Sequence, residues 1–151
     1  MSRPIDINAK IDRCAYYPGE VVTIVCNVSN KSSVGVIPRV TLRQIQTFKQ
    51  LMAAKNNEKT VRRQTTHAVK KQRLEGSLTE PGLSTTHIFH VEIPIDIPIS
   101  VDCPILTVSY DLHLTVDIPS AIDLHLDLPI MITTKNVVNQ YKPYNSEYKM
   151  T

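Results

Sequence analysis

The chain has 151 residues, ten Pro, four Gly and a net charge of +3, which fits one domain able to bury a core without a disulfide framework. Its many Val, Ile and Thr residues favour strands over helices, and its three cysteines lack the C-x-x-C spacing of zinc sites. No apolar run approaches the ~20 residues that span a bilayer, and residues 1–10 do not resemble a signal peptide, which indicates a cytoplasmic protein or domain.

Two strands joined by a turn are predicted at the start of the chain. Apolar and polar residues alternate with a period of two over residues 5–11 and 22–28, so each strand has one buried face. Between them, residues 17–20 combine a Pro that presets φ with Gly19, which tolerates a positive φ, as a tight turn requires. Cys26 lies in the apolar row and is expected to be buried.

A long hairpin follows, with strands over residues 40–51 and 60–69 and a tip at residues 55–58. A helix over residues 44–59 is the competing interpretation, but β-branched residues and paired Asn favour the hairpin. Between residues 49 and 73 there are eight basic residues and one acid, whereas residues 74–134 contain nine acids and no Lys or Arg. We predict a basic arm that binds an anionic partner, with a solvated charge run as the alternative; its residues are Lys55, Lys59, Arg62, Arg63, Lys70, Lys71 and Arg73.

The next segment is predicted to contain a loop over residues 75–86, a short strand over residues 85–91 and an extended connector over residues 93–99. A second hairpin then has strands over residues 106–118 and 122–132; apolar side chains occupy every second position in both, opposed by polar residues through 106–118 and by Asp123, His125 and Asp127. Because a shift of one residue would expose one apolar row, the register is strongly specified.

In the predicted register, Ile118 lies opposite Ile122 across the turn. The same register places His113 opposite Asp127, and Thr115 opposite His125. Pro129 cannot donate a hydrogen bond to a neighbouring strand and therefore marks an edge or a bulge. Residues 1–134 are predicted to form an all-β, antiparallel immunoglobulin-like β-sandwich, followed by a polar, Tyr-rich tail over residues 135–151 that we expect to be flexible or to lie along the surface.

The sequence offers weak catalytic and metal constellations, so no catalytic residue, metal site or cofactor is predicted. His87 and His90 have a spacing that chelates a metal from a turn, but on a strand they point to opposite faces. His113 with Asp127 forms either a pH-sensitive pair, part of a metal site with Asp111, or a solvated ion pair of small energetic effect. Cys14 and Cys103 are interpreted as structural thiols.

The order of several segments resembles a known family. Residues 9–13 and 17–20, with the Asn and Ser residues at 30–33, resemble the start of the C-terminal domain of the alpha-arrestins, the arrestin domain-containing proteins. Residues 103–112, 116–124 and 128–132 resemble the last hairpin of that domain. The resemblance spans residues 5–134 and implies a sandwich of the arrestin C-terminal type.

The resemblance implies an adaptor rather than an enzyme. Alpha-arrestins couple membrane receptors and transporters to WW-domain ubiquitin ligases, and so promote cargo ubiquitination, endocytosis and endosomal sorting. The ligase is engaged through proline-tyrosine motifs, whereas Lys142-Pro143-Tyr144 lacks the doubled proline. Ligase recruitment is therefore expected only through a tail outside this sequence, and the absence of an N-terminal arrestin domain suggests an excised domain or a shortened protein. Thioredoxin binding by a cysteine is not carried over, because residues 49–91 contain no Cys.

The leading hypothesis is a cytoplasmic interaction module that presents the basic arm to the cytoplasmic tails of membrane receptors or transporters, with recruitment to plasma membrane and endosomes. An anionic membrane surface is a second candidate partner for the arm; nucleic acid is not expected, because only Phe48 offers an aromatic ring nearby. The alternatives are an architectural sandwich that self-associates through edge strands, and a metal- or thiol-dependent enzyme using His87, His90 or Cys103.

Overall fold

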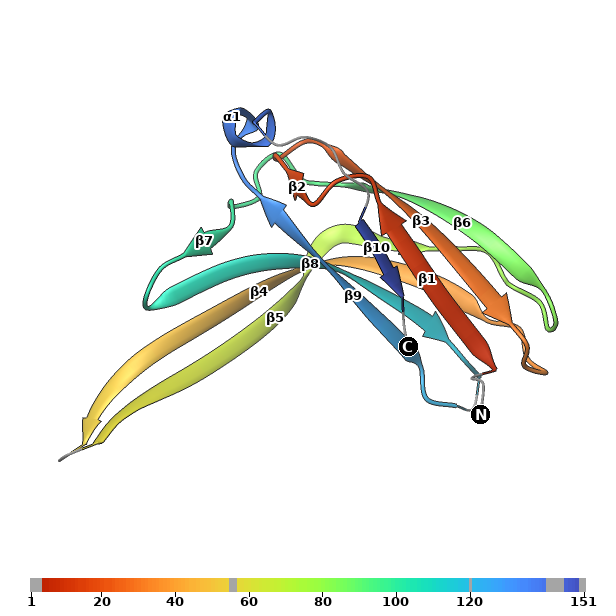
Figure 1. Ribbon diagram of the computed structural model, residues 1–151, viewed down its shortest axis with the longest axis horizontal. Helices are drawn as coiled ribbons and strands as arrows, with labels where there is room; N and C mark the ends of the chain where they lie inside the picture. Colours follow the sequence, from red (N-terminus) through yellow and green to blue (C-terminus); the bar gives the residue numbers. More distant parts are fainter. Residues whose placement is uncertain (1–3, 55–56, 120, 141–145, 150–151) are drawn as a thin grey trace.

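The computed structural model describes residues 4–54, 57–119, 121–140 and 146–149, and within them the side chains of residues 4–49, 62–69, 74–119 and 121–140. Two sheets stack to form the predicted β-sandwich (Figure 1). The smaller sheet has the strand order β10 (Ser146–Lys149), β1 (Ile5–Ile11), β3 (Val21–Asn30) and β6 (Ser84–Glu92).

The larger sheet has the strand order β2 (Ala15–Tyr16), β9 (Leu124–Ile132), β8 (Leu106–Asp117), β4 (Ile37–Ala54) and β5 (Asn57–Glu75), and β7 (Val101–Asp102) also pairs with β8. All of these pairs are antiparallel except that of β2 with β9. The predicted all-β, antiparallel, immunoglobulin-like fold is confirmed.

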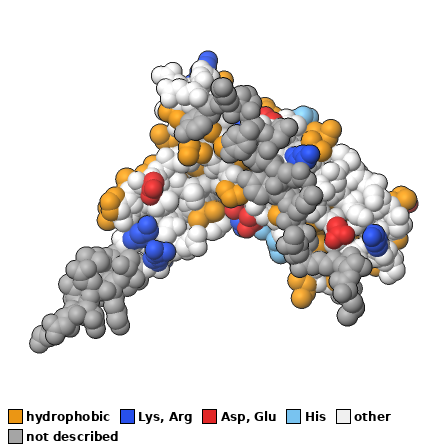
Figure 2. All heavy atoms as spheres, viewed as in Figure 1, with side chains coloured by type: hydrophobic (Ala, Val, Ile, Leu, Met, Phe, Trp, Pro, Cys, Tyr) orange, Lys and Arg blue, Asp and Glu red, His pale blue; other side chains and the backbone are white. Residues whose placement is uncertain are grey.

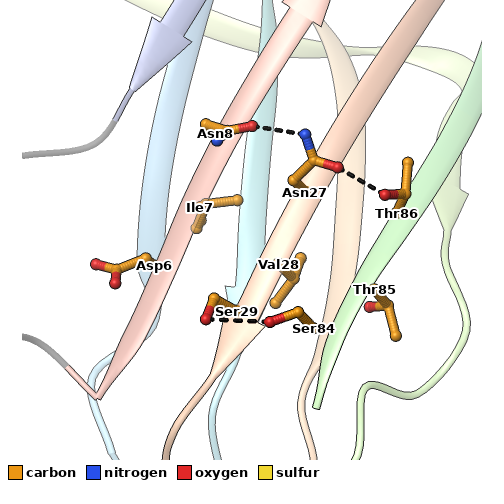
Figure 3. Close-up of a pocket in the computed structure, with 9 residues that line it drawn as sticks. All are labelled: Asp6, Ile7, Asn8, Asn27, Val28, Ser29, Ser84, Thr85 and Thr86. Carbon is orange, nitrogen blue, oxygen red and sulfur yellow. Dashed lines mark hydrogen bonds between the residues drawn. The ribbon is translucent and has the colours of Figure 1, made fainter.

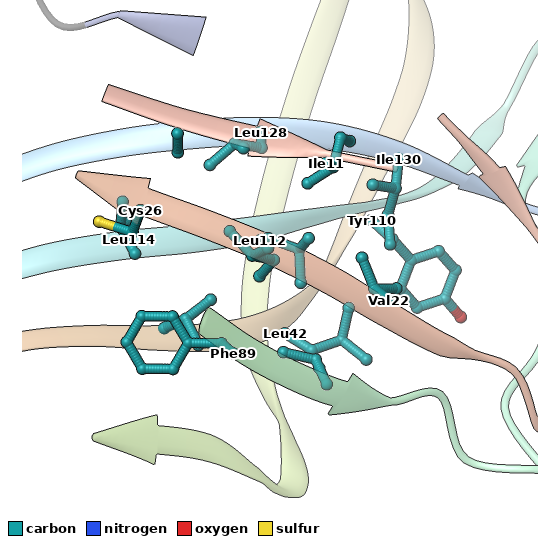
Figure 4. Close-up of a cluster of buried hydrophobic side chains, with 14 of the residues drawn as sticks. Ile11, Val22, Cys26, Leu42, Phe89, Tyr110, Leu112, Leu114, Leu128 and Ile130 are labelled. Carbon is teal, nitrogen blue, oxygen red and sulfur yellow. The ribbon is translucent and has the colours of Figure 1, made fainter. Parts of the chain in front are cut away.

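The core lies between the two sheets and consists largely of the apolar rows that the alternation predicts, although Ile122, at the start of one predicted row, is 90% exposed. Val22, Cys26 and the other inward residues of β3 are at most 1% exposed, and Leu112 and Leu114 of β8 are fully buried. Figure 4 shows these side chains of β3 and β8 within one cluster. Because burying one large aliphatic side chain contributes about 1.5–3 kcal/mol, this cluster is the main source of stability.

The turn predicted before β3 is present at residues 17–20. The backbone nitrogen of Glu20 donates to the carbonyl of Tyr17 over 3.1 Å, and Gly19 has a φ of 95°. A side chain at that φ is disfavoured, so the glycine has a conformational reason to be there.

The predicted register of the β8–β9 hairpin is confirmed. His113 pairs with Asp127, and Thr115 with His125. Pro129 lies opposite Asp111 without a register shift, so it marks no bulge. On its other side β9 pairs with β2 only at Met131 and Ile132, which leaves Pro129 at an open edge.

The β4–β5 hairpin is also present, and the competing helix over residues 44–59 is wrong. β4 pairs with β8 as far as Phe48, where the partner is Leu106. Beyond that point β4 and β5 pair only with each other, from Lys49 opposite Arg62 to Ala54 opposite Asn57. This two-stranded extension, here called the arm, projects from the sandwich at the lower left of Figure 1.

Two elements after residue 134 were not predicted. Helix α1 (Lys135–Val138) is capped at its N-terminus by Thr134, whose hydroxyl accepts a hydrogen bond from the backbone nitrogen of Val137 over 3.4 Å. β10 pairs antiparallel with β1, from Asn8 opposite Lys149 to Ile11 opposite Ser146, and so extends the smaller sheet by one strand.

Candidate functional site

The structure places the predicted basic residues as follows. Arg62 and Arg63 lie side by side on β5 and are both exposed. Because successive residues of a strand point to opposite faces, these two side chains project from opposite faces of the hairpin. Lys59, Lys70, Lys71 and Arg73 belong to β5, but their side chains are outside the described set, and Lys55 lies outside the described residues altogether.

A bulge interrupts the pairing of β4 with β5 within the body of the larger sheet. Arg43 pairs with Ala68 and Thr41 pairs with Arg73, so two steps along β4 correspond to five steps along β5. The three additional residues of β5 fall within residues 69–72, which contain two of the predicted lysines, Lys70 and Lys71. A bulge of this kind bends the strand and interrupts regular pairing. The basic residues of β5 are therefore divided between the straight strand and the bulge.

A hollow of about 770 Å³ lies at the base of the arm, and we call it the arm hollow. Phe48, Ile105 and Leu106 supply its apolar side chains, and Phe48 and Ile105 are 44% and 71% exposed. Lys49, Arg63 and His67 add basic groups, with Gln46 and Thr65 completing the lining. Basic side chains gather beside the described base of the arm in Figure 2. The arm hollow thus combines an apolar floor with a basic rim.

The arm hollow exists because the larger sheet extends past the smaller one. On the inner face of β4, Val40 and Leu42 are fully buried, whereas Phe48 on the same face is 44% exposed. Gln44 marks the end of the apolar core, because its side-chain nitrogen donates to the hydroxyl of Tyr110 over 2.8 Å. That hydroxyl in turn donates to the carbonyl of Pro98 over 2.5 Å. The arm hollow is therefore a continuation of the core-facing surface that the described strands of the smaller sheet leave exposed.

The basic groups at the arm differ from those on the sandwich body in their pairing. On the body, Arg43 binds both carboxylate oxygens of Asp111 over 2.8 and 2.6 Å, and Arg39 pairs with Asp117. Among the residues whose side chains are described, no carboxylate lies within ion-pair distance of Lys49, Arg62 or Arg63. As far as the described side chains go, these three charges can pair with an external anion.

The outer face of the larger sheet carries a polar network around Asp127. His113 Nδ1 lies 2.6 Å from a carboxylate oxygen of Asp127, and Nδ1 of His125 lies 3.2 Å from Nε2 of His113. Arg43 approaches the same Asp127 oxygen at 3.2 Å. Since Asp111 is bound by Arg43, it is not the third ligand of a metal site with His113. The predicted cross-strand pair of His113 and Asp127 is confirmed.

The remaining histidine and cysteine candidates differ in their burial and in their hydrogen-bond partners. His87 is buried, with Nε2 at 2.7 Å from the hydroxyl of Thr85, and burial lowers its pKa. His90 lies on the exposed face, 3.4 Å from the hydroxyl of Thr23, so the two histidines point to opposite faces as predicted. Cys103 is exposed, whereas burial raises the pKa of Cys26 to about 12. Within the described ranges, no group of three or more His, Cys, Asp or Glu could hold a metal ion.

A second hollow, of about 550 Å³, lies on the outer face of the smaller sheet and was not predicted (Figure 3). Asn27 donates to Asn8 over 2.9 Å and accepts from Thr86 over 2.7 Å, so a row of polar groups crosses β1, β3 and β6. These side chains largely satisfy one another. The only sequence signal for this hollow is the run of Asn, Ser and Thr at outward positions of the strands.

None of the helices in the described part of the chain is long and apolar enough to cross a membrane.

The fold defines the general class as an immunoglobulin-like β-sandwich domain. The family model described as "Arrestin (or S-antigen), C-terminal domain" matches residues 1–137. The chain therefore belongs to the arrestin C-terminal domain family, and the resemblance to arrestin domain-containing proteins is confirmed.

Among its relatives, Arrestin domain-containing protein 4 of Homo sapiens is 32% identical over 88% of this chain, and that of Mus musculus is 33% identical over the same share. The chain spans 30% of the length of each of these relatives. Among solved structures, the sporulation control protein Spo0M from Bacillus subtilis has a TM-score of 0.52 and 19% identity, covering 91% of this chain and 54% of that chain. The likeness to Spo0M concerns the fold alone.

Proposed function

We propose that this chain is a non-catalytic adaptor domain that binds the cytoplasmic tails of membrane receptors or transporters. In this role it supports the ubiquitination, endocytosis and endosomal sorting of that cargo, from the cytoplasm and by peripheral recruitment to plasma membrane and endosomes. A WW-domain ubiquitin ligase would be engaged by a segment outside the sequence described here. The family membership and the similarity to arrestin domain-containing proteins support the proposal.

The observation that carries the proposal is the basic charge along β5. From residue 59 to residue 74, the sequence has six Lys or Arg and no acid. Arg62 and Arg63 are exposed and have no carboxylate partner among the described side chains. Guanidinium groups bind carboxylates and phosphates through paired, charge-assisted hydrogen bonds. An acidic or phosphorylated tail therefore complements this surface better than a basic or neutral one.

Charge reversal on β5 tests the proposal. We expect Arg62→Glu combined with Arg63→Glu to weaken binding to a phosphorylated, acidic peptide at least about tenfold, or 1.4 kcal/mol. The melting temperature should stay unchanged, because both side chains are exposed. Lys31→Glu combined with Lys135→Glu makes the same change in net charge at exposed sites away from the arm and serves as the control. Equal weakening by both double variants would mean that net charge, not the arm, determines binding.

A second candidate function is self-association through β5, which ends the larger sheet in the described part of the chain. An edge strand of 19 residues exposes unpaired backbone groups that another copy could extend. Light scattering across a range of protein concentrations tests it, because a rising molar mass would support assembly and a constant monomer mass would exclude it.

A further inference from the structure

We propose that the arm hollow is an anchor site for one large apolar side chain within an acidic, extended peptide. This inference rests on the proposed function and names the feature of the cargo tail that the domain selects. Charge reversal of the arm tests whether an acidic segment binds at all. The arm hollow determines which acidic segment binds best.

The floor of the arm hollow is suited to an apolar group. Phe48, Ile105 and Leu106 come from β4, from the residue before β8 and from the start of β8, and they line the same hollow. The backbone nitrogen of Lys49 donates to the carbonyl of Ile105 over 2.9 Å, which fixes the position of Ile105 beside β4. A ligand side chain that packs on this floor removes apolar surface of Phe48 and Ile105 from water, and aromatic residues in such positions often dominate binding.

The rim of the arm hollow determines the charge of the ligand. Lys49, Arg63 and His67 line it, and none of its described lining residues is acidic. An apolar group alone would leave the two permanent charges without a partner, whereas carboxylates on either side of the anchor would pair with them. A basic peptide would meet like charges and is rejected.

The shape of the arm hollow favours an extended peptide over a second folded domain. Its lining residues lie on three neighbouring strands and the residue before β8, so the surface runs across the sheet. Its volume of about 770 Å³ is in the range of pockets that bind small ligands and short peptide segments. The paired strands of the arm continue beyond it, from Lys49 opposite Arg62 to Ala54 opposite Asn57.

Fluorescence anisotropy with three labelled peptides tests the proposal on the whole chain. The first peptide has a central Phe flanked by glutamates, the second has Ala at the centre, and the third has lysines in place of the glutamates. We expect the Phe peptide to bind at least about tenfold more tightly than the Ala peptide, equal to 1.4 kcal/mol at 25 °C. We expect no binding of the lysine peptide.

Variants of the floor then locate the preference. In Phe48→Ala the advantage of the Phe peptide should fall to about twofold or less. Ile105→Ala gives an independent test if Phe48→Ala lowers the melting temperature, because Ile105 is 71% exposed and lies outside the strands. The matched control is Ile95→Ala, in which an equally apolar residue that is 85% exposed is removed from another part of the surface. The control should keep the full advantage.

The possible results separate the two proposals. A preference for Phe that is lost in Phe48→Ala and Ile105→Ala but kept in Ile95→Ala supports the anchor site. If both glutamate peptides bind equally and Arg63→Glu weakens both, the anchor site is wrong and the proposed function stands. If no glutamate peptide binds, or if the lysine peptide binds as well as the others, both proposals are overturned.

Discussion

The ion pair between Arg43 and Asp111 allows a sharp test of how charge is buried in this sandwich. The carboxylate of Asp111 is 7% exposed and accepts two hydrogen bonds from Arg43, whose side chain is 22% exposed. Arg43 has a second acidic neighbour, Asp127 at 3.2 Å, whereas Arg43 is the only cation within ion-pair distance of Asp111 among the described side chains. Without Asp111, Arg43 therefore keeps one acidic partner. Without Arg43, Asp111 keeps no cationic partner among the described side chains.

Removing the arginine should cost more than removing the aspartate. Arg43→Ala leaves a buried, unpaired carboxylate, for which a loss of about 3–4 kcal/mol in the free energy of unfolding is expected. Asp111→Ala leaves the partly exposed guanidinium of Arg43, which still contacts Asp127. The loss in the free energy of unfolding should therefore be about 1.5–2.5 kcal/mol. For a domain of this size, the larger loss corresponds to a decrease in melting temperature of about 10 °C.

Urea denaturation of both single variants and of the double variant measures these values. The double variant should be no less stable than Arg43→Ala, because the unpaired carboxylate is then absent, and the coupling energy should exceed about 1 kcal/mol. Arg62→Ala, at an exposed arginine of the arm, should change stability by less than about 0.5 kcal/mol and is the control. A larger loss for Asp111→Ala than for Arg43→Ala, or additive losses, would refute the reasoning.

Three further predictions concern single residues. Burial lowers the pKa of His87 in the folded chain. In the unfolded chain, His87 takes up a proton as the pH falls below the ordinary histidine pKa of about 6.5, whereas in the folded chain it stays neutral at that pH. Stability should therefore be greatest above pH 6.5 and decrease below it. The difference between the urea midpoints at pH 5.5 and pH 7.5 should be smaller in His87→Gln than in the wild type. An unchanged difference would contradict the assignment. A thiol reagent should modify exposed Cys103 in the native protein but Cys26 only after unfolding, as mass spectrometry of the labelled protein would show. Gly19→Ala should destabilise the fold by about 1–2 kcal/mol through its φ of 95° alone, since the nearest atom to the added carbon would be at 3.9 Å, and a midpoint equal to the wild-type value would contradict this.

The sequence predicted strand positions and register best where a strand has one buried face and one solvent-exposed face. The register of β8 and β9 follows from two matching rows of apolar residues and a short turn, and both features are local in sequence. The turn at Gly19 is local as well. The resemblance to the arrestin family added the correct type of sandwich to the same prediction.

Features that depend on distant segments were missed. Asp111 lies on the polar face of an alternating strand, yet it is buried because Arg43, 68 residues away in sequence, covers it. β10 depends on pairing between the end of the chain and β1, and its sequence lacks the alternation of apolar and polar residues that predicts a strand. The arm hollow depends on where the smaller sheet ends, for which the only signal within β4 is the change from inward Val40 and Leu42 to Gln44.

The continuity of β4 links the chemistry of the arm to the packing of the core. One strand contributes Leu42 to the buried interior and Phe48 to the open end, and its pairing with β8 fixes both orientations. If that pairing shifted by one residue, the side chain of Lys49 would point to the face that Phe48 now occupies. The arm hollow would then contain a positive charge in place of an aromatic ring. Mutations deep in the interior are therefore expected to change the selectivity of the proposed anchor site without altering any residue that lines the arm hollow.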